Sequence, residues 1–186
     1  MSVQLQRLQF TVDEYHRMES AGILTEDDRV ELIEGEIVQM SPIGRRHAAC
    51  VNRLNRLFSQ RLGARAIVAV QNPVELSSRS EPQPDLALLQ TRPDFYESGH
   101  PQPEDVFLLV EVADTTAESD REVKVPLYAR SAIAEVWLVD IDRQCLEVYL
   151  MPSLNGYQNE RKYQRGETLF VQAFSDVSFT VDEILG

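Results

Sequence analysis

The most informative residue of the sequence is Glu111, an acid inside the apolar run VFLLVEV at residues 106–112. A nearly continuous apolar run of this length is typical of a strand that is covered on both faces. Alternation along the strand predicts that Phe107, Leu109 and Glu111 share one face. Because burying an unpaired ionised carboxylate is costly, we expect Glu111 to have a partner near the end of this strand. That partner is a basic side chain or a metal ion.

Asp85 follows Pro84 and begins a second predicted strand at residues 85–90. If this strand pairs in antiparallel fashion with residues 106–112, its start lies beside the end of the other strand, and Asp85 approaches Glu111. Two ionised carboxylates in a half-buried cleft require a shared cation. Oxygen ligands with open water positions suit Mg²⁺ or Mn²⁺, which one or two carboxylates commonly hold together with a substrate phosphate. Taken alone, an aspartate after proline is more often an ordinary turn residue than a functional one.

Lys124 is the third candidate, and it lies in a predicted helix at residues 118–131, where Pro126 is unfavourable in a regular helix interior. A rise of ~1.5 Å per helical residue and ~3.3 Å per strand residue places Lys124 level with Glu111. An amine at this position can orient an attacking water or stabilise a pentacoordinate phosphorus. The alternative is a solvated lysine on the helix surface. Tyr128, one turn further on, is interpreted as a core residue.

The elements that position these residues follow from the periodicity of the apolar side chains. We expect a helix at 11–21, a hairpin at 29–40, a helix at 47–62, strands at 66–76, 85–90, 106–112 and 135–140, a helix at 118–131, and a C-terminal meander of strands at 145–150, 157–163 and 168–173. This order predicts the α/β class, with a mixed sheet and a helix on each face. We also expect a single domain over residues 1–186, with its core at about residues 45–140.

Charge is unevenly distributed along the chain, whose formal net charge is -12. Six arginines and no acid lie between residues 45 and 65, whereas the other 12 basic residues are set against 30 acidic ones. An acidic surface repels nucleic acid, so this segment is the one candidate surface for an anion. Arg53 and Arg56 lie off the apolar stripe of the predicted helix and are expected to face solvent. The alternative is an ordinary solvated helix face.

The composition excludes several classes of protein. No window approaches 18 consecutive apolar residues, which excludes a transmembrane helix, and the N-terminal sequence lacks the pattern of a secretory signal. Cys50 and Cys145 are too few for a disulfide framework or a structural zinc site. We therefore expect a cytoplasmic protein with reduced thiols and no membrane partner.

Seven motifs, taken in this order along residues 10–150, carry a family resemblance. They are ELIEGEI at 31–37, Ser41-Pro42, His47, QPDL at 83–86, LVEV at 109–112, DREVKVPLYAR at 120–130 and EVWLVD at 135–140. Together they resemble the Uma-type restriction endonuclease family, a branch of the PD-(D/E)xK superfamily of metal-dependent nucleases. The resemblance implies a restriction endonuclease-like αβββαβ core, in agreement with the order of elements read from periodicity.

The resemblance also implies roles for individual residues. It makes Asp85 and Glu111 the metal ligands and the backbone carbonyl of Val112 a third. The superfamily lysine belongs two residues after the glutamate, where this sequence has Ala113. Lys124 resembles the version in which the amine comes from the following helix.

Glu31 and His47 also match family positions. A glutamate from the N-terminal region can reach the metal through water, and His47 is expected either to touch phosphate or to cap its helix. The implied activity is Mg²⁺- or Mn²⁺-dependent endonucleolytic hydrolysis of DNA. Arg46, Arg53 and Arg56 are the candidate contacts to the DNA backbone.

A different class of function remains open alongside the enzyme. The chain could keep the nuclease fold without turnover and act as a binding or scaffold module, which the acidic balance outside residues 45–65 favours. A homodimer formed through the C-terminal meander or an exposed sheet edge is also expected from the fold class.

Overall fold

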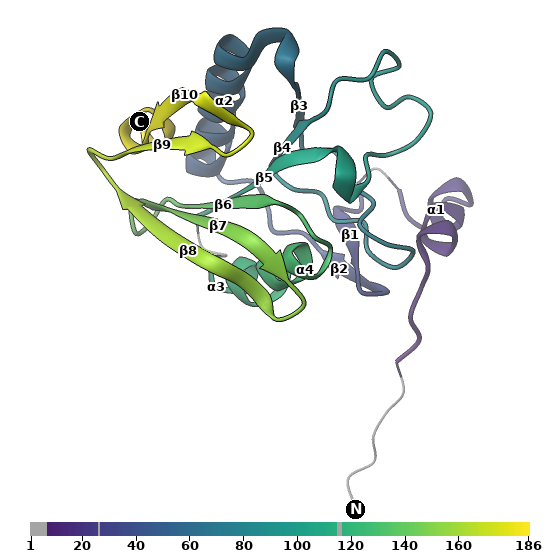
Figure 1. Cartoon of the computed structure of the whole chain (residues 1–186). Helices are drawn as coiled ribbons and strands as arrows, with labels where there is room; N and C mark the ends of the chain where they lie inside the picture. The colour runs from purple at the N-terminus through teal and green to yellow at the C-terminus, as the bar shows by residue number, and fades with distance from the viewer. Residues whose placement is uncertain (1–6, 26, 115–116) are drawn as a thin grey trace, which may run out of the picture.

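One mixed sheet forms the centre of the molecule (Figure 1). The computed structural model describes residues 7–25, 27–114 and 117–186. The six strands of this sheet are, in spatial order, β3 (Ile67–Val70), β4 (Leu86–Leu89), β5 (Val106–Ala113), β6 (Glu135–Asp140), β7 (Cys145–Ser153) and β8 (Gly156–Gln164). β5 and β6 are parallel, and every other neighbouring pair is antiparallel. The predicted mixed sheet with an αβββαβ core is therefore confirmed.

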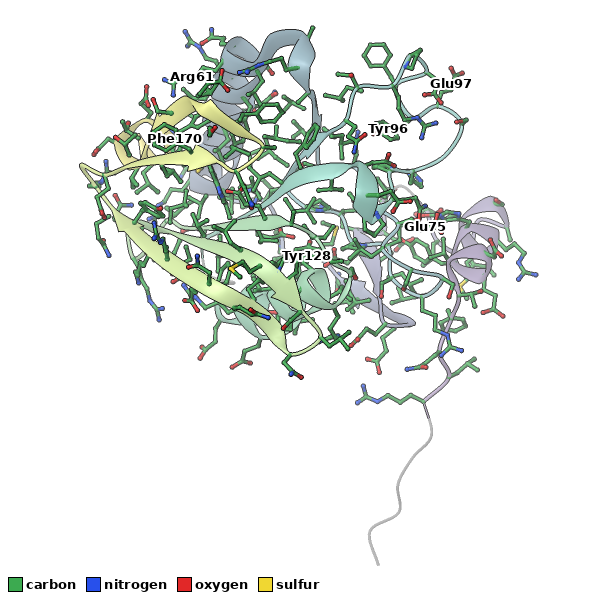
Figure 2. All side chains as sticks on the ribbon, in the orientation of Figure 1. Arg61, Glu75, Tyr96, Glu97, Tyr128 and Phe170 are labelled. Carbon is green, nitrogen blue, oxygen red and sulfur yellow. The ribbon has the colours of Figure 1, made fainter. Side chains whose placement is uncertain are left out.

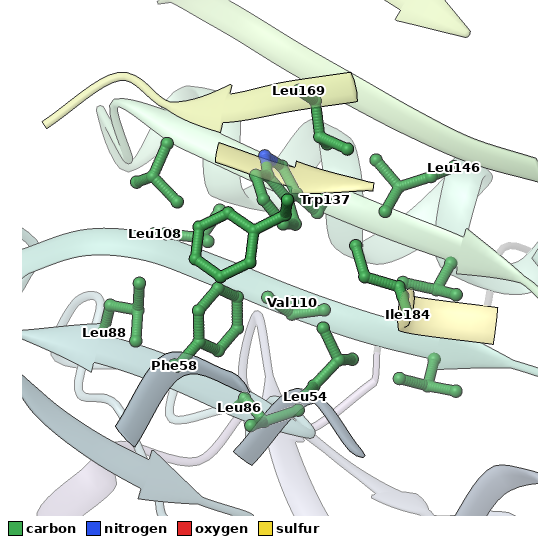
Figure 3. Close-up of a cluster of buried hydrophobic side chains, with 14 of the residues drawn as sticks. Leu54, Phe58, Leu86, Leu88, Leu108, Val110, Trp137, Leu146, Leu169 and Ile184 are labelled. Carbon is green, nitrogen blue, oxygen red and sulfur yellow. The ribbon is translucent and has the colours of Figure 1, made fainter. Parts of the chain in front are cut away.

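Helix α2 (Arg45–Leu62) covers one face of this sheet, as its apolar stripe predicts. Leu54 and Phe58 are fully buried in the larger of the hydrophobic clusters, where the ring of Phe58 packs against that of Trp137 of β6 (Figure 3). Fully burying a Leu or Phe side chain stabilises the fold by about 1.5–3 kcal/mol. Helix α4 (Val125–Arg130) covers the opposite face, where Leu127 is buried.

The N-terminal elements also form where the sequence predicts them. Helix α1 (Val12–Ser20) begins at the Thr11–Glu14 capping box. Strands β1 (Val30–Ile33) and β2 (Glu36–Gln39) form a hairpin. Its turn residues, Glu34 and Gly35, have φ angles of 48° and 83°, a conformation that favours glycine.

The regular alternation predicted along β5 is wrong at Phe107. Leu88 pairs with Leu108, whereas Leu89 pairs with Val106, so a bulge inserts one residue into β5. The bulge turns Phe107 to the α2 face, where its ring packs on that of Phe174. Alternation resumes after the bulge and keeps Leu109 on the α4 face.

The helix predicted at 118–131 is divided into three parts. They are α3 (Ala117–Ser119), the π-helical segment η3 (Asp120–Lys124) and α4. The Val125 N–H bonds the carbonyl of Asp120, five residues back, and Pro126 lies in the first turn of α4. Proline is tolerated there because a first-turn N–H has no intrahelical partner. The π turn thus resolves the conflict that Pro126 creates in the sequence pattern.

The predicted C-terminal meander is only partly correct. Strands β7 and β8 continue the main sheet, and β9 (Thr168–Val171) leaves it to pair with an unpredicted strand, β10 (Phe174–Thr180). A short helix, α5 (Val181–Leu185), follows and was also missed. Ile184 of α5 and Leu169 of β9 are buried in the cluster on the α2 face (Figure 3).

Membrane insertion through helices finds no support in the structure. Within residues 7–25, 27–114 and 117–186, no helix combines the length and the apolar character needed to cross a bilayer.

Candidate active site at the ends of β4 and β5

The antiparallel pairing of β4 and β5 brings Asp85 to the end of β5, as expected. Leu86 is opposite Val110, so Asp85, one residue earlier, lies beside Glu111. The Val112 N–H donates to Oδ2 of Asp85 at 2.8 Å. This bond fixes the carboxylate of Asp85 at the end of β5.

Glu111 is buried, with 3% of its surface exposed, and it points to the α4 face. Its Oε1 accepts a hydrogen bond from the hydroxyl of Tyr128 and lies 3.3 Å from the ammonium of Lys124. Burial raises the pKa of Glu111 from 4.5 to about 8, and the charge of Asp85 adds to this rise while Lys124 opposes it. Glu111 is therefore a buried acid whose ionised form needs a positively charged partner, as its place in an apolar strand predicts.

Lys124, at the end of the π-helical segment η3, joins two acids. Its Nζ lies 3.1 Å from Oε2 of Glu31 and 3.3 Å from Oε1 of Glu111. Burial lowers the pKa of Lys124, but the charges of Glu111 and Glu31 outweigh burial and raise it overall. The backbone N–H of Gln83 also donates to Oε2 of Glu31 at 3.0 Å, which fixes that carboxylate. Lys124 is thus a charged, buried amine and is not a solvated helix lysine.

His47 lies in the first turn of α2 and contacts Asp85 directly. Its Nε2 is 2.9 Å from Oδ2 of Asp85, and this hydrogen bond raises the pKa of His47. The other ring nitrogen, Nδ1, is buried without a hydrogen-bond partner among the residues that the structure describes. The side-chain amide of Gln71 is 3.3 Å from Oδ1 of Asp85. His47 therefore orients Asp85 and leaves one nitrogen within the site.

Glu31, His47, Asp85, Glu111 and Lys124 line a cleft of about 720 Å³ between the β1–β2 hairpin, the start of α2 and η3. Its acidic lining residues are Glu31, Glu34, Glu36, Asp85, Glu111, Asp114 and Asp120, and its basic ones are Arg29 and Lys124, with His47. Val112 also lines the cleft. Such an excess of negative charge in a concave site attracts and concentrates cations.

The arginines of α2 are largely engaged within the protein. Arg46 pairs with Asp114 at 3.1 Å and Asp142 at 2.8 Å. Arg53 donates to the carbonyls of Ile184 and Leu185 at the end of α5. The expectation that Arg53 points to solvent is therefore wrong, because the unpredicted helix α5 covers it.

Of the other four arginines between residues 45 and 65, two form ion pairs, whereas Arg45 and Arg56 are exposed. Arg61 pairs with Glu183 and Arg65 with Asp176. Arg56 is exposed and has no hydrogen bond or ion pair within the described ranges. Of the three predicted DNA contacts, Arg56 alone faces solvent without such a partner in that part of the chain.

The sequence predicts Tyr128 as a core residue, and the structure adds a contact of its hydroxyl with Glu111 that this prediction does not include. The ring is fully buried, as predicted, but the hydroxyl binds the site carboxylate. The signal was present, since Tyr128 follows Lys124 by four residues and so lies on the same helix face. A tyrosine buried on that face needs a hydrogen-bond acceptor, and Glu111 supplies it.

Comparisons with known proteins agree with this geometry. The model of the Uma2 family, described as "Putative restriction endonuclease", matches residues 12–182. The fold is similar to the crystal structure of a "putative nuclease belonging to DUF820" from Anabaena variabilis ATCC 29413, with a TM-score of 0.72. The two share 16% identity over 95% of this chain and 97% of the other, which supports a common restriction endonuclease-like fold. No curated protein matches the chain.

Proposed function

This chain belongs to the Uma2 family, and from that premise we propose that it is an endonuclease that hydrolyses DNA phosphodiester bonds with Mg²⁺ or Mn²⁺. One observation carries the proposal. Asp85, Glu111 and Lys124 come from three separate elements and meet in one acidic cleft. Two carboxylates and an amine are the groups that metal-assisted phosphodiester hydrolysis requires.

The residues of the cleft fit a divalent ion. Asp85 and Glu111 offer hard oxygen donors, and Oε2 of Glu111 has no hydrogen bond within the described ranges, since Tyr128 and Lys124 both bind Oε1. We assign Asp85, Glu111 and the carbonyl of Val112 as the residues that would hold the ion. A bound divalent ion supplies a water of lowered pKa and neutralises charge on the phosphate.

The other residues of the site support these ligands. Tyr128 and Lys124 fix one oxygen of Glu111, and His47 fixes one oxygen of Asp85. The ammonium of Lys124 is positioned to donate a hydrogen bond to the attacking water or to a non-bridging phosphate oxygen. Glu31 keeps Lys124 in place, and this contact gives Glu31 a supporting role in the site.

The test is nicking of supercoiled plasmid with Mg²⁺ or Mn²⁺ by the parent and by Asp85→Asn. Losing a residue that only supports a metal ligand costs about 10–100-fold, so we expect losing Asp85 to cost about 100-fold or more. Asp176→Asn is a matched control, because Asp176 is exposed and pairs with Arg65 away from the cleft. Equal nicking by Asp85→Asn and the parent would contradict the proposal.

A second candidate is a binding or scaffold module without turnover. Ion pairs within the protein neutralise Arg46, Arg61 and Arg65, which weakens the case for a DNA-binding helix face. Calorimetric titration with Mn²⁺ distinguishes the two candidates. Binding that disappears in Asp85→Asn favours the nuclease, whereas a parent that neither binds Mn²⁺ nor nicks DNA favours the scaffold.

A further inference from the structure

A second group of metal-binding residue types lies outside the lining of the cleft. His16 of α1, Glu81 of the segment between β3 and β4, and His100 of the segment between β4 and β5 converge so that one ligand atom from each lies within 4.8 Å of the others. None of the three lines the proposed active site. Since the chain has 3 histidines, two of them meet here and the third is His47.

The carboxylate of Glu81 is the fixed centre of this group. Nε2 of His16 lies 2.9 Å from Oε1 and 3.1 Å from Oε2 of Glu81, and the rings of His16 and His100 meet edge to face at 5.9 Å. The backbone N–H of Glu81 donates to the carbonyl of Leu32 at 2.8 Å and so ties Glu81 to β1. Both imidazoles therefore approach a carboxylate whose backbone is held in place.

The charge balance around Glu81 calls for a cation. Glu81 is 3% exposed, and no lysine or arginine within residues 7–25, 27–114 and 117–186 pairs with it. Glu75 is close enough to act electrostatically on both Glu81 and His16, and it lies beside α1 in Figure 2. A buried carboxylate is normally paired or bound to a metal. His16 and His100 are partly or fully exposed, so an ion can reach the group from solvent.

The segment that carries His100 is already anchored next to the group. The carbonyl of Pro101 accepts a hydrogen bond from the N–H of Glu75 at 3.0 Å. His100 is thus tied to the same segment that supplies Glu81. Preorganisation of this kind reduces the ordering cost that a ligand has to offset.

We propose that His16, Glu81 and His100 form a Zn²⁺ site with a water in the fourth position. Two imidazoles and a carboxylate are ligands that Zn²⁺ prefers, whereas Mg²⁺ prefers an all-oxygen set. The ion displaces the proton shared between His16 and Glu81, and this proton is released to solvent. The bound ion links α1, the β3–β4 segment and the β4–β5 segment, which are far apart in sequence.

The test is calorimetric titration of untagged, chelator-treated protein with Zn²⁺. Asp85→Asn is used as the background and Mg²⁺ is added in excess, so that binding in the cleft is suppressed. We expect one Zn²⁺ per chain, and His100→Ala should weaken binding by about 100-fold. Glu97→Ala is the matched control, because Glu97 is an exposed residue of the same segment outside the group.

A second measurement tests the same site through thermal stability, so that the assignment does not depend on the measured affinity alone. Zn²⁺ should raise the melting temperature of the Asp85→Asn protein and of its Glu97→Ala derivative, and at the same Zn²⁺ concentration it should raise that of the His100→Ala derivative much less. His100 is exposed, so its replacement leaves the core intact. Absence of Zn²⁺ binding in Asp85→Asn, or binding that His100→Ala does not weaken, would overturn the assignment, whatever the outcome of the plasmid assay.

Discussion

Glu111 shows how one residue determines the chemistry of the cleft. It is an acid in a strand that is otherwise apolar, and the fold surrounds it with Tyr128, Lys124 and Asp85. A hydroxyl and an ammonium partly offset its burial, and a divalent ion would complete the compensation. The residue is thus costly for the metal-free fold and useful for metal binding.

The cost of burying Glu111 should be visible in the pH dependence of the free energy of unfolding of the metal-free protein. Burial raises the pKa of Glu111 from 4.5 to about 8, so the folded protein keeps a proton that the unfolded chain has released. The contribution of Glu111 to the free energy of unfolding therefore falls as the pH rises between these values. In urea titrations with chelator, Glu111→Gln should gain stability over the parent with rising pH, by about 1 kcal/mol or more at pH 8.

The exposed Glu97→Gln is the control for that series and should follow the parent at every pH. A stability difference between Glu111→Gln and the parent that stays constant from pH 5 to pH 8 would mean that Glu111 is already ionised in the metal-free fold. Glu135, also buried, has its pKa raised to about 7, but it is present in all three proteins and cancels in the comparison.

At the scale of elements, the π-helical segment η3 positions the amine. Lys124 is its last residue, and the wider turn lets Pro126 begin α4 without losing an interior hydrogen bond. Inserted π turns are frequent at functional sites, because one added residue changes the direction of the side chains that precede it. This element brings the ammonium of Lys124 to 3.3 Å from Oε1 of Glu111, in a chain that has Ala113 two residues after that glutamate.

Pro126→Ala tests this role of η3. Alanine restores an N–H and favours a regular α-helix, in which a one-residue shift rotates side chains by about 100°. We expect metal-dependent nicking to fall by about tenfold or more while the protein stays folded, measured by plasmid assay and circular dichroism. Glu122→Ala, on the exposed side of the same segment, should keep parent activity. Unchanged nicking by Pro126→Ala would show that the π turn does not position Lys124.

The elements that periodicity predicted best are those with long apolar patterns. The two strands that join Asp85 to Glu111 followed from strong apolar patterns, whereas their antiparallel pairing was a condition of the prediction, which the structure meets. The bulge at Phe107 has no such signal, because it changes pairing without changing the apolar pattern. β10 and α5 were missed because short, mixed segments at the chain end gain their stability from packing on α2.

At the scale of the whole molecule, ion pairs within the protein determine how much positive charge the surface presents to DNA. The sequence located the six arginines but not their partners, because Asp176, Glu183 and the end of α5 are distant in sequence. Ion pairs neutralise Arg46, Arg61 and Arg65, and Arg53 binds backbone carbonyls, whereas Arg45 and Arg56 are exposed. The single domain and the homodimer stay predictions.

Arg53→Ala and Arg56→Ala should distinguish an arginine that stabilises the fold from an arginine that contacts DNA. Arg53 binds carbonyls at the end of α5, so its loss should lower the free energy of unfolding by about 1–2 kcal/mol. Arg56→Ala should leave stability within about 0.5 kcal/mol of the parent and reduce the salt dependence of duplex binding by about one phosphate contact. Fluorescence anisotropy across a salt series measures the latter. An unchanged salt slope for Arg56→Ala would remove Arg56 from the DNA interface.

The central claim is that Asp85 and Glu111 share one divalent ion. The most direct measurement is anomalous diffraction from crystals of the protein grown with Mn²⁺, compared with crystals of Glu111→Gln grown in the same way. We predict a manganese peak bonded to both carboxylates in the parent, which is lost or greatly weakened in the variant. A parent structure with Mn²⁺ bound elsewhere, or with Glu111 held by Lys124 and Tyr128 alone in saturating Mn²⁺, would contradict it.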